Sequence, residues 1–508
     1  MADTSVLITG SGPTGLVLAL WLTQSGVRVR IIDKTAEAGT TSRAVVVQAR
    51  TLELYDQLGL AAVVVARGEK VVAINAWFAG RKAARAVFGD MGAGLSPFPF
   101  ALIFPQDEHE RLLIERLSEA GVHVERQTEL LSFEDNGRIL ARLKLPDGSV
   151  ENCAAGYLAG CDGAHSTVRE ALGIQFPGGT YAHTFYVADV EASRATPSGE
   201  IDVGLDVSDF LAVFPLKGDR HARLIGTVRE DAATPHEKLT WNDVSRRVVD
   251  WMHIDVARVN WFSTYRVHHR VAEHFRQGNA FLLGDAAHIH SPVGGQGMNT
   301  GIGDAVNLAW KLSEVLHARA HAKLLDTYEP ERMAFARRLV ATTDRAFTAV
   351  TSSGTLARLL RLNVAPRLVP FLFGFGTLRH FLFRTVSQIG VHYRESSLSQ
   401  GSTGILHAGD RLPWASNFQP LTSRAWQVHV YGEASPELKA VCDQRNLPLH
   451  TFPWRAQLTR TGLARNALYL IRPDGYIALT DPTSNPTTLT SYLEANGMTT
   501  PNFTTTWP

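Results

Sequence analysis

The hydrophobic positions at the start of the chain follow a strand–helix–strand pattern. Val6-Leu7-Ile8 is a short apolar run, residues 14–24 form a longer apolar segment, and residues 27–32 are rich in β-branched side chains. Short apolar runs predict buried strands, and the longer segment between them predicts a helix. Apolar side chains at helical spacing predict a further helix over residues 50–58. The chain is therefore expected to begin with a βαβ unit.

A second pattern begins near residue 184, where alternating strands replace the strand–helix alternation. After this region, residues 280–283 form a continuously apolar run, which is typical of a strand in a buried parallel sheet. The first region is therefore expected to be interrupted by a sheet-based region and then resumed. The other elements expected up to this point and just beyond are helices over 107–120, 241–251 and 305–317, strands over 122–133, 185–190 and 211–214, and a Gly- and Pro-rich loop over 89–99.

The last third of the chain contains two further patterns. Residues 359–383 are aromatic, basic and apolar, which permits an interfacial membrane helix, but Pro366 and Pro370 interrupt the segment and favour packed helices. The composition changes after residue 401, where strands are expected over 427–431 and 467–471. A separate α/β domain is therefore expected at the C-terminus.

These patterns predict an α/β protein with four parts. The first domain is discontinuous and comprises residues 1–75, 100–180 and 276–345. A sheet domain comprises residues 76–99 and 181–275, residues 346–400 form a helical connector, and residues 401–508 form the C-terminal domain.

The composition limits the possible functions. Of the 508 residues, 45% are apolar and 19% are charged, which excludes a disordered or fibrous chain. The 50 Lys and Arg residues nearly balance the 49 Asp and Glu residues, so no electrostatic signal for nucleic acid or an anionic membrane is present. No apolar run is long enough to span a bilayer, and the glycine-broken N-terminus does not resemble a signal peptide. The three cysteines are too few for a disulfide framework, and a cytoplasmic location is expected.

The strongest local motif is G-x-G-x-x-G, formed by Gly10, Gly12 and Gly15 between the first strand and the first helix. The first glycine permits a tight turn, the second lets a pyrophosphate approach the main chain, and the third allows close helix–strand packing. Asp33 ends the second strand and is suited to bind a ribose hydroxyl. This combination predicts a dinucleotide site.

Two later motifs carry further polar chemistry. The sequence GCDG at 160–163 leads to Arg169, and GDAAH at 284–288 follows the apolar run 280–283. The glycine-rich segment 291–299 then opens directly onto a helix. An acid at a strand end can bind a polyol, glycines let a flat ring approach main-chain N–H groups, and a helix start stabilises negative charge. These residues permit flavin chemistry.

The three motifs in this order resemble those of the FAD-dependent aromatic hydroxylases, the single-component (class A) flavoprotein monooxygenases. The resemblance covers most of the chain and implies a Rossmann-type FAD-binding domain interrupted by the sheet domain. It also implies a role for each matching residue. These are Gly10, Gly12, Pro13, Thr14, Gly15, Asp33 and Lys34 at the ADP half of FAD, Arg43 near the pyrophosphate, Gln106 and Asp285 at the ribityl chain, Leu130 by the adenine, Asp162 in the motif shared by FAD and NAD(P)H, and Pro292, Gly295, Gly297, Met298 and Asn299 around the isoalloxazine.

The C-terminal region resembles the thioredoxin-like domain of the phenol hydroxylase and polyketide hydroxylase branch of this family. The resemblance rests on GDRLP at 409–413 and LIRPDGY at 470–476. No Cys-x-x-Cys is present and Cys442 is isolated, which excludes dithiol chemistry in this domain. A packing or dimerisation role is expected instead.

The sequence departs from common family features at two positions. Gly303 stands where a glutamine is frequent, and Gln48 stands where some phenol-hydroxylating relatives carry a histidine base. A neutral glutamine cannot remove a phenolic proton. The base is therefore unassigned. The candidates for the base or for substrate contact are His183, Tyr186, Arg223 and Tyr265, although a structural role is favoured for each. No metal site is expected, because His109, His268, His269, His288 and His290 lack ligand spacing.

The resemblance implies an NAD(P)H-consuming monooxygenase that uses O2 to hydroxylate a phenolic or polyketide aromatic ring through a flavin C4a-hydroperoxide. NADPH and NADH both remain open as the reductant, and a homodimer is expected from relatives. Three alternatives also remain open: Baeyer–Villiger insertion, epoxidation, and a non-catalytic FAD-binding paralogue. The substrate itself is not specified by the sequence.

Overall fold

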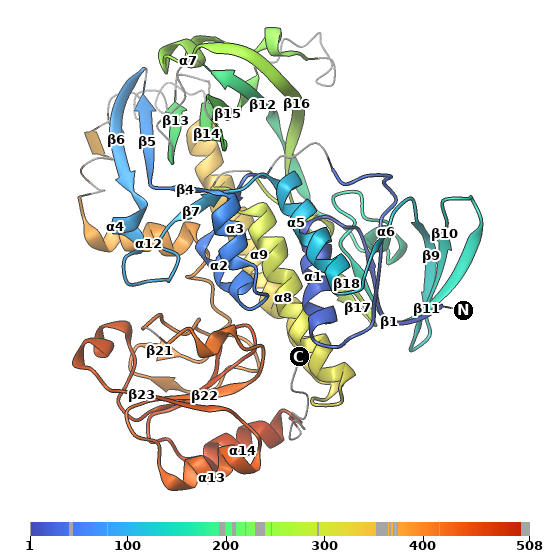
Figure 1. Ribbon diagram of the computed structural model, residues 1–508, viewed down its shortest axis with the longest axis vertical. Coiled ribbons are helices and arrows are strands. Elements are labelled where there is room, and N and C mark those ends of the chain that lie inside the picture. The colour runs from blue at the N-terminus through green and yellow to red at the C-terminus, as the bar shows by residue number, and fades with distance from the viewer. Residues whose placement is uncertain are drawn as a thin grey trace.

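The computed structural model describes most of the chain. The described residues are 2–39, 44–78, 80–192, 199–205, 210–218, 220–228, 239–244, 246–291, 294–351, 364, 367–368, 371, 374–415 and 417–498. Three bodies are visible in Figure 1: a mixed sheet with helices, a large sheet at the top of the view, and an α/β unit at the bottom. Among the described helices, none combines the length and the apolar character that crossing a bilayer requires.

The first body is built on a largely parallel sheet. Its strand order is β17 (Arg276–Gln277), β18 (Ala280–Leu282), β11 (Val150–Gly160), β1 (Ala2–Thr9), β2 (Val29–Ile32) and β8 (Val124–Glu125), with β9 (Glu129–Asp135) and β10 (Ile139–Lys144) attached to β11. Parallel pairing joins β1 to both β2 and β11, and β11 to β18. The sheet therefore brings together strands from residues 2–32, 150–160 and 280–282, as the interrupted pattern predicted.

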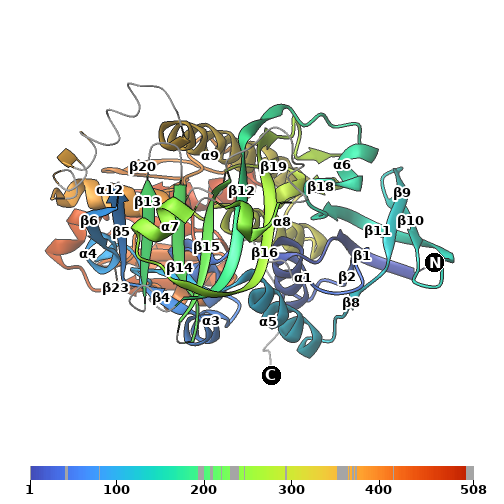
Figure 2. The ribbon, with the colours of Figure 1, turned by 90° about the horizontal axis from the view of Figure 1, so that it is seen from above.

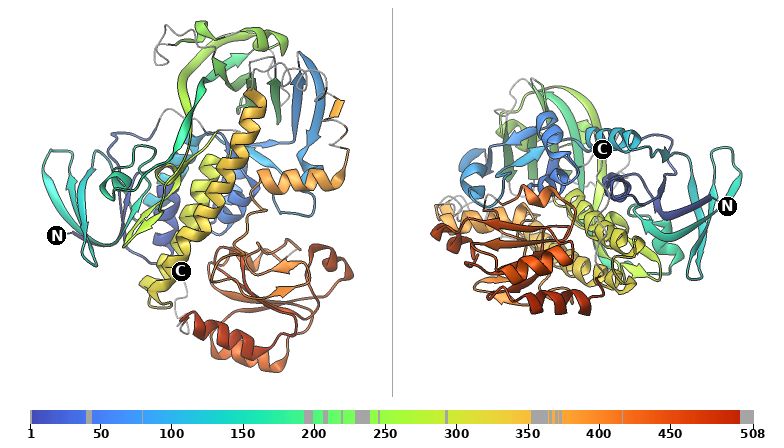
Figure 3. Two further views of the ribbon diagram at one scale, coloured as in Figure 1. Left: turned by 180° about the vertical axis from the view of Figure 1, so that it is seen from behind. Right: turned by 60° about the horizontal axis from the view of Figure 1, so that its bottom comes forward.

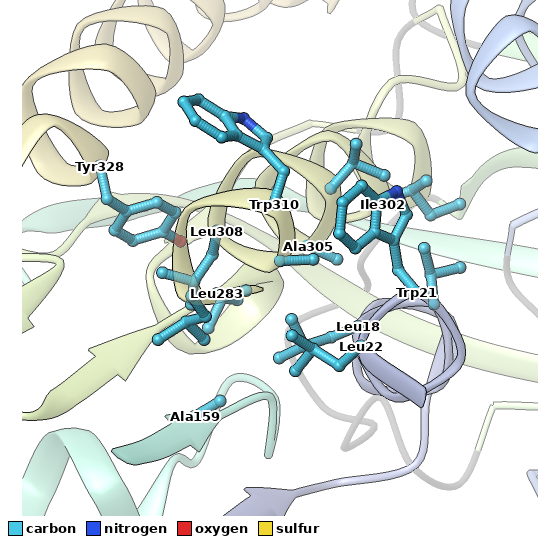
Figure 4. Packing of buried hydrophobic residues seen from close by; sticks show 14 of the residues in the cluster. Leu18, Trp21, Leu22, Ala159, Leu283, Ile302, Ala305, Leu308, Trp310 and Tyr328 are labelled. Atoms are coloured by element: carbon cyan, nitrogen blue, oxygen red, sulfur yellow. The ribbon is translucent and has the colours of Figure 1, made fainter. Parts of the chain in front are cut away.

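Helix α1 (Pro13–Gln24) packs against α8 (Gly297–Leu316) at the centre of this body. Leu18, Trp21 and Leu22 of α1 lie next to Ile302 and Ala305 of α8 in Figure 4. All five side chains are at most 1% exposed. Because α1 carries apolar residues all round, it is buried on several sides, which explains why its sequence shows no polar face.

The second body is an eight-stranded sheet whose strands come from distant parts of the chain. Seen from above in Figure 2, β5 and β6 continue the sheet formed by the later strands. The order is β19 (His288–Ile289), β16 (Val256–Val271), β12 (Gly178–Ala192), β15 (His221–Val228), β14 (Phe210–Pro215), β13 (Glu200–Leu205), β5 (Ala73–Phe78) and β6 (Arg81–Val87). Strand β19 begins at His288, the last residue of GDAAH, so this sheet is connected to the first body at the motif itself.

The C-terminal body has a four-stranded sheet of order β23 (Leu449–Phe452), β22 (Gln427–Tyr431), β24 (Leu468–Ile471) and β25 (Ile477–Asp481). Helix α13 (Pro436–Gln444) connects the parallel pair β22 and β23, and α14 (Pro486–Ala495) follows the antiparallel pair β24 and β25. The left view of Figure 3 shows the long helices α8 and α9 (Tyr328–Thr351) running side by side between the large sheet and this body.

The remaining elements are short and mostly surround these bodies. They are β3 (Val46–Val47), α2 (Ala49–Asp56), α3 (Ala61–Arg67), β4 (Glu69–Val71), α4 (Phe88–Gly92), β7 (Ala101–Ile103), α5 (Gln106–Glu119), α6 (Thr167–Ala171), α7 (Arg246–Trp251), α12 (Gly376–Val386), β20 (Ser402–Thr403), β21 (Leu406–His407), and 3-10 turns at 241–243, 284–286, 322–327, 420–422 and 456–461.

Most of the predicted elements are confirmed, and three predictions need correction. The single helix expected over 241–251 is replaced by a 3-10 turn at Trp241–Asp243 and the short helix α7, because Val244 between them is extended. The loop expected over 89–99 begins with α4, because Phe88 and Met91 are buried and Phe88 packs edge-on against Phe383 of α12 at a centroid distance of 6.3 Å. The helix expected over 305–317 begins at Gly297, because buried polar residues of its first turns find partners inside the protein. The packed helix expected over 359–383 lies largely outside the described residues.

The buried histidine of α5 gives a pH-dependent prediction. His109 is 0% exposed and is hydrogen-bonded to the Tyr55 hydroxyl, and burial lowers the pKa of His109 to about 3. Below a pH of about 6.5 the unfolded chain binds a proton that the folded chain does not, so stability falls as the pH falls toward 3. The wild type loses this stability and His109→Phe does not. We therefore expect the free energy of unfolding of His109→Phe, relative to that of the wild type, to rise by about 2 to 3 kcal/mol as the pH falls from about 7 to about 4.5.

The measurement is the difference in free energy of unfolding between the variant and the wild type across this pH range. The Tyr55 hydroxyl loses its partner in the variant, but that cost is independent of pH over the range used. If the difference in free energy of unfolding between His109→Phe and the wild type does not change with pH, the pKa of His109 is not lowered in the folded protein.

Candidate active site

The glycine turn between β1 and α1 is shaped for a group that approaches the main chain. Gly10 has a φ of +93°, and a Cβ there would lie 2.3 Å from the carbonyl oxygen of Cys161. A Cβ on Gly15 would lie 2.0 Å from the carbonyl oxygen of Gly10, whereas a Cβ on Gly12 would meet nothing within 4 Å. Gly12 is also the N-cap of α1, where the first N–H groups favour an anion. Two glycines are thus required by packing, and the third faces open space that fits a phosphate.

The carboxylate of Asp33 lies beside this turn at the end of β2. It accepts hydrogen bonds from the main-chain N–H and hydroxyl of Ser11, at 2.8 and 2.7 Å, and from the same two groups of Thr35, at 2.9 and 2.7 Å. Burial alone would raise the pKa of Asp33, but the hydrogen bonds from Thr35 and Ser11 hold it below its usual value. Asp33 is therefore an ionised, half-buried acceptor that holds the turn, and the neighbouring Lys34 is exposed.

Asp162 follows β11 and organises the second motif. Its carboxylate accepts hydrogen bonds from the Ser166 hydroxyl at 2.6 Å and from the Val168 main-chain N–H at 3.2 Å, next to the start of α6. Burial raises the pKa of Asp162 despite these bonds. Arg169 of α6 donates to the main-chain carbonyl of Ala286 at 3.0 Å, so the second motif is bonded to the third.

Asp285 is the exposed member of an otherwise buried turn. Gly284 and Ala286 on either side are fully buried, and Gly284 has a φ of +58°. A Cβ on Gly284 would lie 2.7 Å from the hydroxyl oxygen of Thr14, in the first turn of α1. Thr14 therefore places the first motif directly against the third, at the turn that carries the exposed Asp285.

The glycine loop before α8 lies against β3. Gly294 and Gly295 have φ values of +79° and +61°, and a Cβ on Gly295 would lie 2.9 Å from the Cβ of Val46. Helix α8 begins at Gly297, and Met298 packs against the main hydrophobic core. This close approach requires glycine and leaves the start of α8 next to the strand end.

The side chain of Asn299 fixes the loop to β3 and α2. Its amide donates to the carbonyls of Val46 at 2.9 Å and Gly295 at 2.8 Å, and its oxygen accepts from the Gln48 main-chain N–H at 2.9 Å and the Thr51 hydroxyl at 2.7 Å. These bonds give Asn299 a structural role that the sequence did not indicate.

Three buried polar atoms near this loop have no hydrogen-bond partner among the described residues. They are the side-chain oxygen of Gln48, Nε2 of His290 and the hydroxyl of Ser291. Buried polar atoms nearly always have a partner, so these atoms are candidates for contact with a polar group that binds beside the loop. Burial, together with nearby His288, lowers the pKa of His290 to about 4, so its ring is neutral.

Other predicted contacts are less closely grouped. Gln106 is the first residue of α5, and its amide donates to Glu110 at 2.8 Å. Leu130 is buried in β9, where it faces Leu143 of β10. Arg43 and Pro292 lie outside the described residues.

The four candidates for a base or substrate contact do not share one location. Arg223 of β15 is 2% exposed and forms a two-point ion pair with Asp189 at 2.6 and 2.7 Å. Tyr265 of β16 packs beside Phe185, with ring centroids 5.9 Å apart. Both lie on the sheet face that is rich in aromatic residues and that meets the core around Val46 through Phe214.

Tyr186 lies on the opposite face of the same sheet. Its ring stacks on Phe262 and contacts Trp241, in the cluster that α7 covers. The placement follows from the alternation along β12, since neighbouring residues point to opposite faces. The side chain of His183 lies outside the described residues. Arg223 and Tyr265 are thus the two candidates that share the aromatic face.

No cluster that could hold a metal ion occurs among the described residues. The adjacent His268 and His269 have separate surroundings, since His268 bonds to the Thr180 hydroxyl and His269 packs against Tyr181. Four residues of this region were not predicted from the sequence: Ser11 and Thr35 as partners of Asp33, Asp189 as the partner of Arg223, and Asp304 of α8. An acidic residue on an apolar helix was the available signal for Asp304.

One family model and two known proteins match most of this chain. The family model for the FAD binding domain matches residues 3–343. The chain is 34% identical to a 6-methylpretetramide 4-monooxygenase from Streptomyces rimosus over 96% of this chain and 93% of that protein. It is 32% identical to a pentachlorophenol 4-monooxygenase from Sphingobium chlorophenolicum over 81% of this chain and 76% of that one.

A solved structure is also similar to this chain over nearly its whole length. The anhydrotetracycline hydroxylase from Streptomyces rimosus superimposes with a TM-score of 0.76 at 28% identity, covering 98% of this chain and 100% of the other. The similarity therefore extends through the C-terminal body and is not confined to the region that carries the three motifs.

Proposed function

The chain belongs to the family of FAD-dependent monooxygenases that hydroxylate aromatic and polyketide compounds, and on this premise we propose that its own substrate is a fused-ring aromatic polyketide. One observation carries the choice of substrate class. The polyketide-hydroxylating relative aligns over 96% of this chain, C-terminal body included, whereas the single-ring phenol relative aligns over 81%. The reductant is NADPH or NADH, and the oxidant is O2.

The residues that would hold FAD are those that the three motifs bring together. Gly12 and the start of α1 would accept the pyrophosphate, Asp33 would bind the adenosine ribose, and Asp285 would bind the ribityl chain. The glycine loop and the start of α8 would border the isoalloxazine, where the helix N-terminus stabilises negative charge. The other residues in this proposal are Gly10, Pro13, Thr14, Gly15, Lys34, Arg43, Gln106, Leu130, Asp162, Pro292, Gly295, Gly297, Met298 and Asn299.

Bound FAD supplies the redox chemistry, which comprises acceptance of a hydride from the nicotinamide and transfer of one oxygen atom of O2 to the ring. The chain's own residues position the substrate and exclude water. The aromatic face of the large sheet would form one wall of the substrate site. On this wall, the Arg223–Asp189 ion pair and Tyr265 offer polar contacts. Gln48 is a neutral amide and would contribute hydrogen bonding without removing a proton.

We expect the purified protein to be yellow and to oxidise NADPH or NADH faster when a fused-ring phenolic polyketide is present. The measurement is the absorbance of the reduced nicotinamide against a panel of single-ring phenols, naphthoquinols and angucycline-like polycycles, with mass spectrometry and NMR of each product. A product heavier by one oxygen atom and carrying a new phenol supports the proposal.

Other outcomes would contradict the proposed hydroxylation of a fused-ring polyketide. A lactone or an epoxide as product would show that the protein has a Baeyer–Villiger or an epoxidising activity instead. Stimulation by single-ring phenols alone would change the substrate class. A protein that binds FAD but whose nicotinamide use ignores every aromatic compound would be a non-catalytic paralogue.

The proposal also includes the domain assignment. Residues 1–75, 100–180 and 276–345 would form the FAD-binding domain, residues 76–99 and 181–275 the substrate domain, residues 346–400 the connector, and residues 401–508 a thioredoxin-like domain. The βαβ and ββα arrangement of β22 to α14 supports the last of these, and Cys442 is buried and unpaired in it. A homodimer and a cytoplasmic location complete the proposal, and light scattering and cell fractionation would test them.

A further inference from the structure

A buried carboxylate binds both ends of the turn that carries Asp285. Asp304 of α8 is 0% exposed. Its Oδ2 accepts a hydrogen bond from the main-chain N–H of Gly284 at 3.0 Å and lies 2.7 Å from Nε2 of His288. Gly284 and His288 are the first and last residues of the GDAAH motif, so a single side chain fixes the whole turn around Asp285.

The carboxylate is ionised, and a cation from α9 holds it in place. Arg332 donates through Nε to Oδ1 of Asp304 at 2.6 Å, and its side chain is 3% exposed. Burial alone would raise the pKa of Asp304, but the charge of Arg332 and the hydrogen bonds from His288 and the Gly284 main-chain N–H keep it below its usual value. A charged hydrogen-bond acceptor binds an N–H more strongly than a neutral one.

Gly303 explains how the cation reaches this position. A Cβ at residue 303 would lie 3.0 Å from Nη2 of Arg332, which is closer than a Cβ normally approaches another atom. The departure from the glutamine that is common at this position therefore makes room for the guanidinium against α8. The same guanidinium donates to the carbonyl of Thr300 at 3.1 Å, in the first turns of α8 after the glycine loop.

The connection continues into the C-terminal body. Nη1 of Arg332 donates to the hydroxyl of Tyr393 at 2.7 Å. The Tyr393 ring packs on Tyr476, with centroids 4.4 Å apart, and the guanidinium of Arg472 lies 5.1 Å from the Tyr393 ring centroid. The turn that presents Asp285 is thus joined through two ion-paired side chains and one tyrosine to the LIRPDGY motif.

We propose that Asp304 is a positioning residue for FAD, which fixes the Gly284–His288 turn so that Asp285 meets the cofactor, and that Arg332 joins this turn to the C-terminal body. This inference rests on the proposed role of Asp285. Asp304 acts through the turn and has no contact with the reacting atoms.

The test is a double-mutant cycle on FAD affinity. Asp304→Asn, Asp285→Ala and the double variant are stripped of FAD, and the dissociation constant is measured from quenching of flavin fluorescence on reconstitution. We expect Asp304→Asn to weaken FAD binding on the order of tenfold, by analogy with residues that orient metal ligands. Because Asp304 acts through Asp285, the double variant should bind FAD no more weakly than Asp285→Ala alone.

The matched control is Asp410→Asn, which removes a carboxylate whose side chain is 12% exposed and ion-paired with Arg394 at 2.7 Å, far from the turn in sequence. It is expected to lower the melting temperature without changing FAD affinity. The visible spectrum of the bound flavin should shift in Asp304→Asn and remain unchanged in the control.

The outcomes separate the inference from its premise. Additive effects of Asp304→Asn and Asp285→Ala, or an Asp304→Asn variant with wild-type affinity and spectrum, would overturn the positioning role. If Asp285→Ala itself binds FAD normally, the proposed role of Asp285 fails instead. Should Asp304→Asn not fold, Arg332→Lys is used, which keeps the charge but loses the fork of donors. It is then expected to weaken FAD binding in the wild type but not in the Asp285→Ala background, and additivity there would equally overturn the inference.

Discussion

Replacement of Gly12 by alanine is expected to give a folded protein that has lost its yellow colour. A Cβ at this position meets nothing within 4 Å in the protein, and Gly12 has an ordinary φ of −70°, so the substitution introduces no strain. The methyl group instead occupies the open space at the start of α1, where the pyrophosphate of FAD would approach the main chain. We expect FAD affinity to fall by about 100-fold, which corresponds to about 2.7 kcal/mol.

The measurement is the FAD dissociation constant of the reconstituted apoprotein, together with its circular dichroism and melting temperature without FAD. Gly89→Ala is the matched control, because a Cβ on Gly89 also meets nothing within 4 Å and its φ is not positive. The control should bind FAD as the wild type does. Unchanged FAD affinity in Gly12→Ala would show that the pyrophosphate does not bind at this turn.

The contrast among the three glycines shows what the sequence could predict. The roles of Gly10 and Gly15 in packing and of Gly12 in leaving room follow from a motif whose spacing already implies a strand, a turn and a helix. Asp33 was predicted for the same reason, because it ends the next strand. Features of this kind can be predicted from the sequence, because the residues that determine them are close together in the chain.

The residues that were missed or misplaced depend on long-range packing. Tyr186 and Tyr265 were equivalent candidates, and only the register of β12 against β16 separates them onto opposite faces. Asp304 and Arg332 are 28 residues apart, and their meeting depends on how α8 and α9 pack. The helix at Phe88 forms because Phe383 covers it, which local propensity cannot reveal.

The contacts of the LIRPDGY motif also depend on long-range packing and could not be predicted from the sequence. Its arginine, Arg472, is buried against the first body. Arg472, Lys311 and Glu331 each have side chains that are 0% exposed. Glu331 is ion-paired with Lys311 at 2.8 Å and with Arg472 at 2.8 Å, and Arg472 is also paired with Asp474 at 2.7 Å. Two positive and two negative charges thus balance in the interior. The C-terminal body is attached by this cluster, which explains why the motif is charged although it lies in a buried turn.

Removal of one charge from this cluster should therefore be costly. Glu331→Gln keeps the shape of the side chain but leaves Lys311 and Arg472 with Asp474 as the only anion of the four. Burial alone would raise the pKa of Glu331, and Arg472 and Lys311 keep it far below its usual value, so the wild-type carboxylate is charged at neutral pH. Loss of one partner of a buried pair typically costs about 3 to 5 kcal/mol.

Thermal unfolding of the holoprotein at one scan rate would measure this cost against a surface control. Glu494→Gln removes a carboxylate that is 62% exposed and paired with Arg445 at 2.6 Å, and exposed pairs contribute at most about 1 kcal/mol. The double variant Lys311→Met/Glu331→Gln removes one charge of each sign, so it should lose less stability than the sum of the two single variants. If Glu331→Gln lowers stability no more than Glu494→Gln does, the buried cluster does not hold the C-terminal body to the rest of the protein, because an uncompensated charge in the interior destabilises the folded state by more than the loss of an exposed pair.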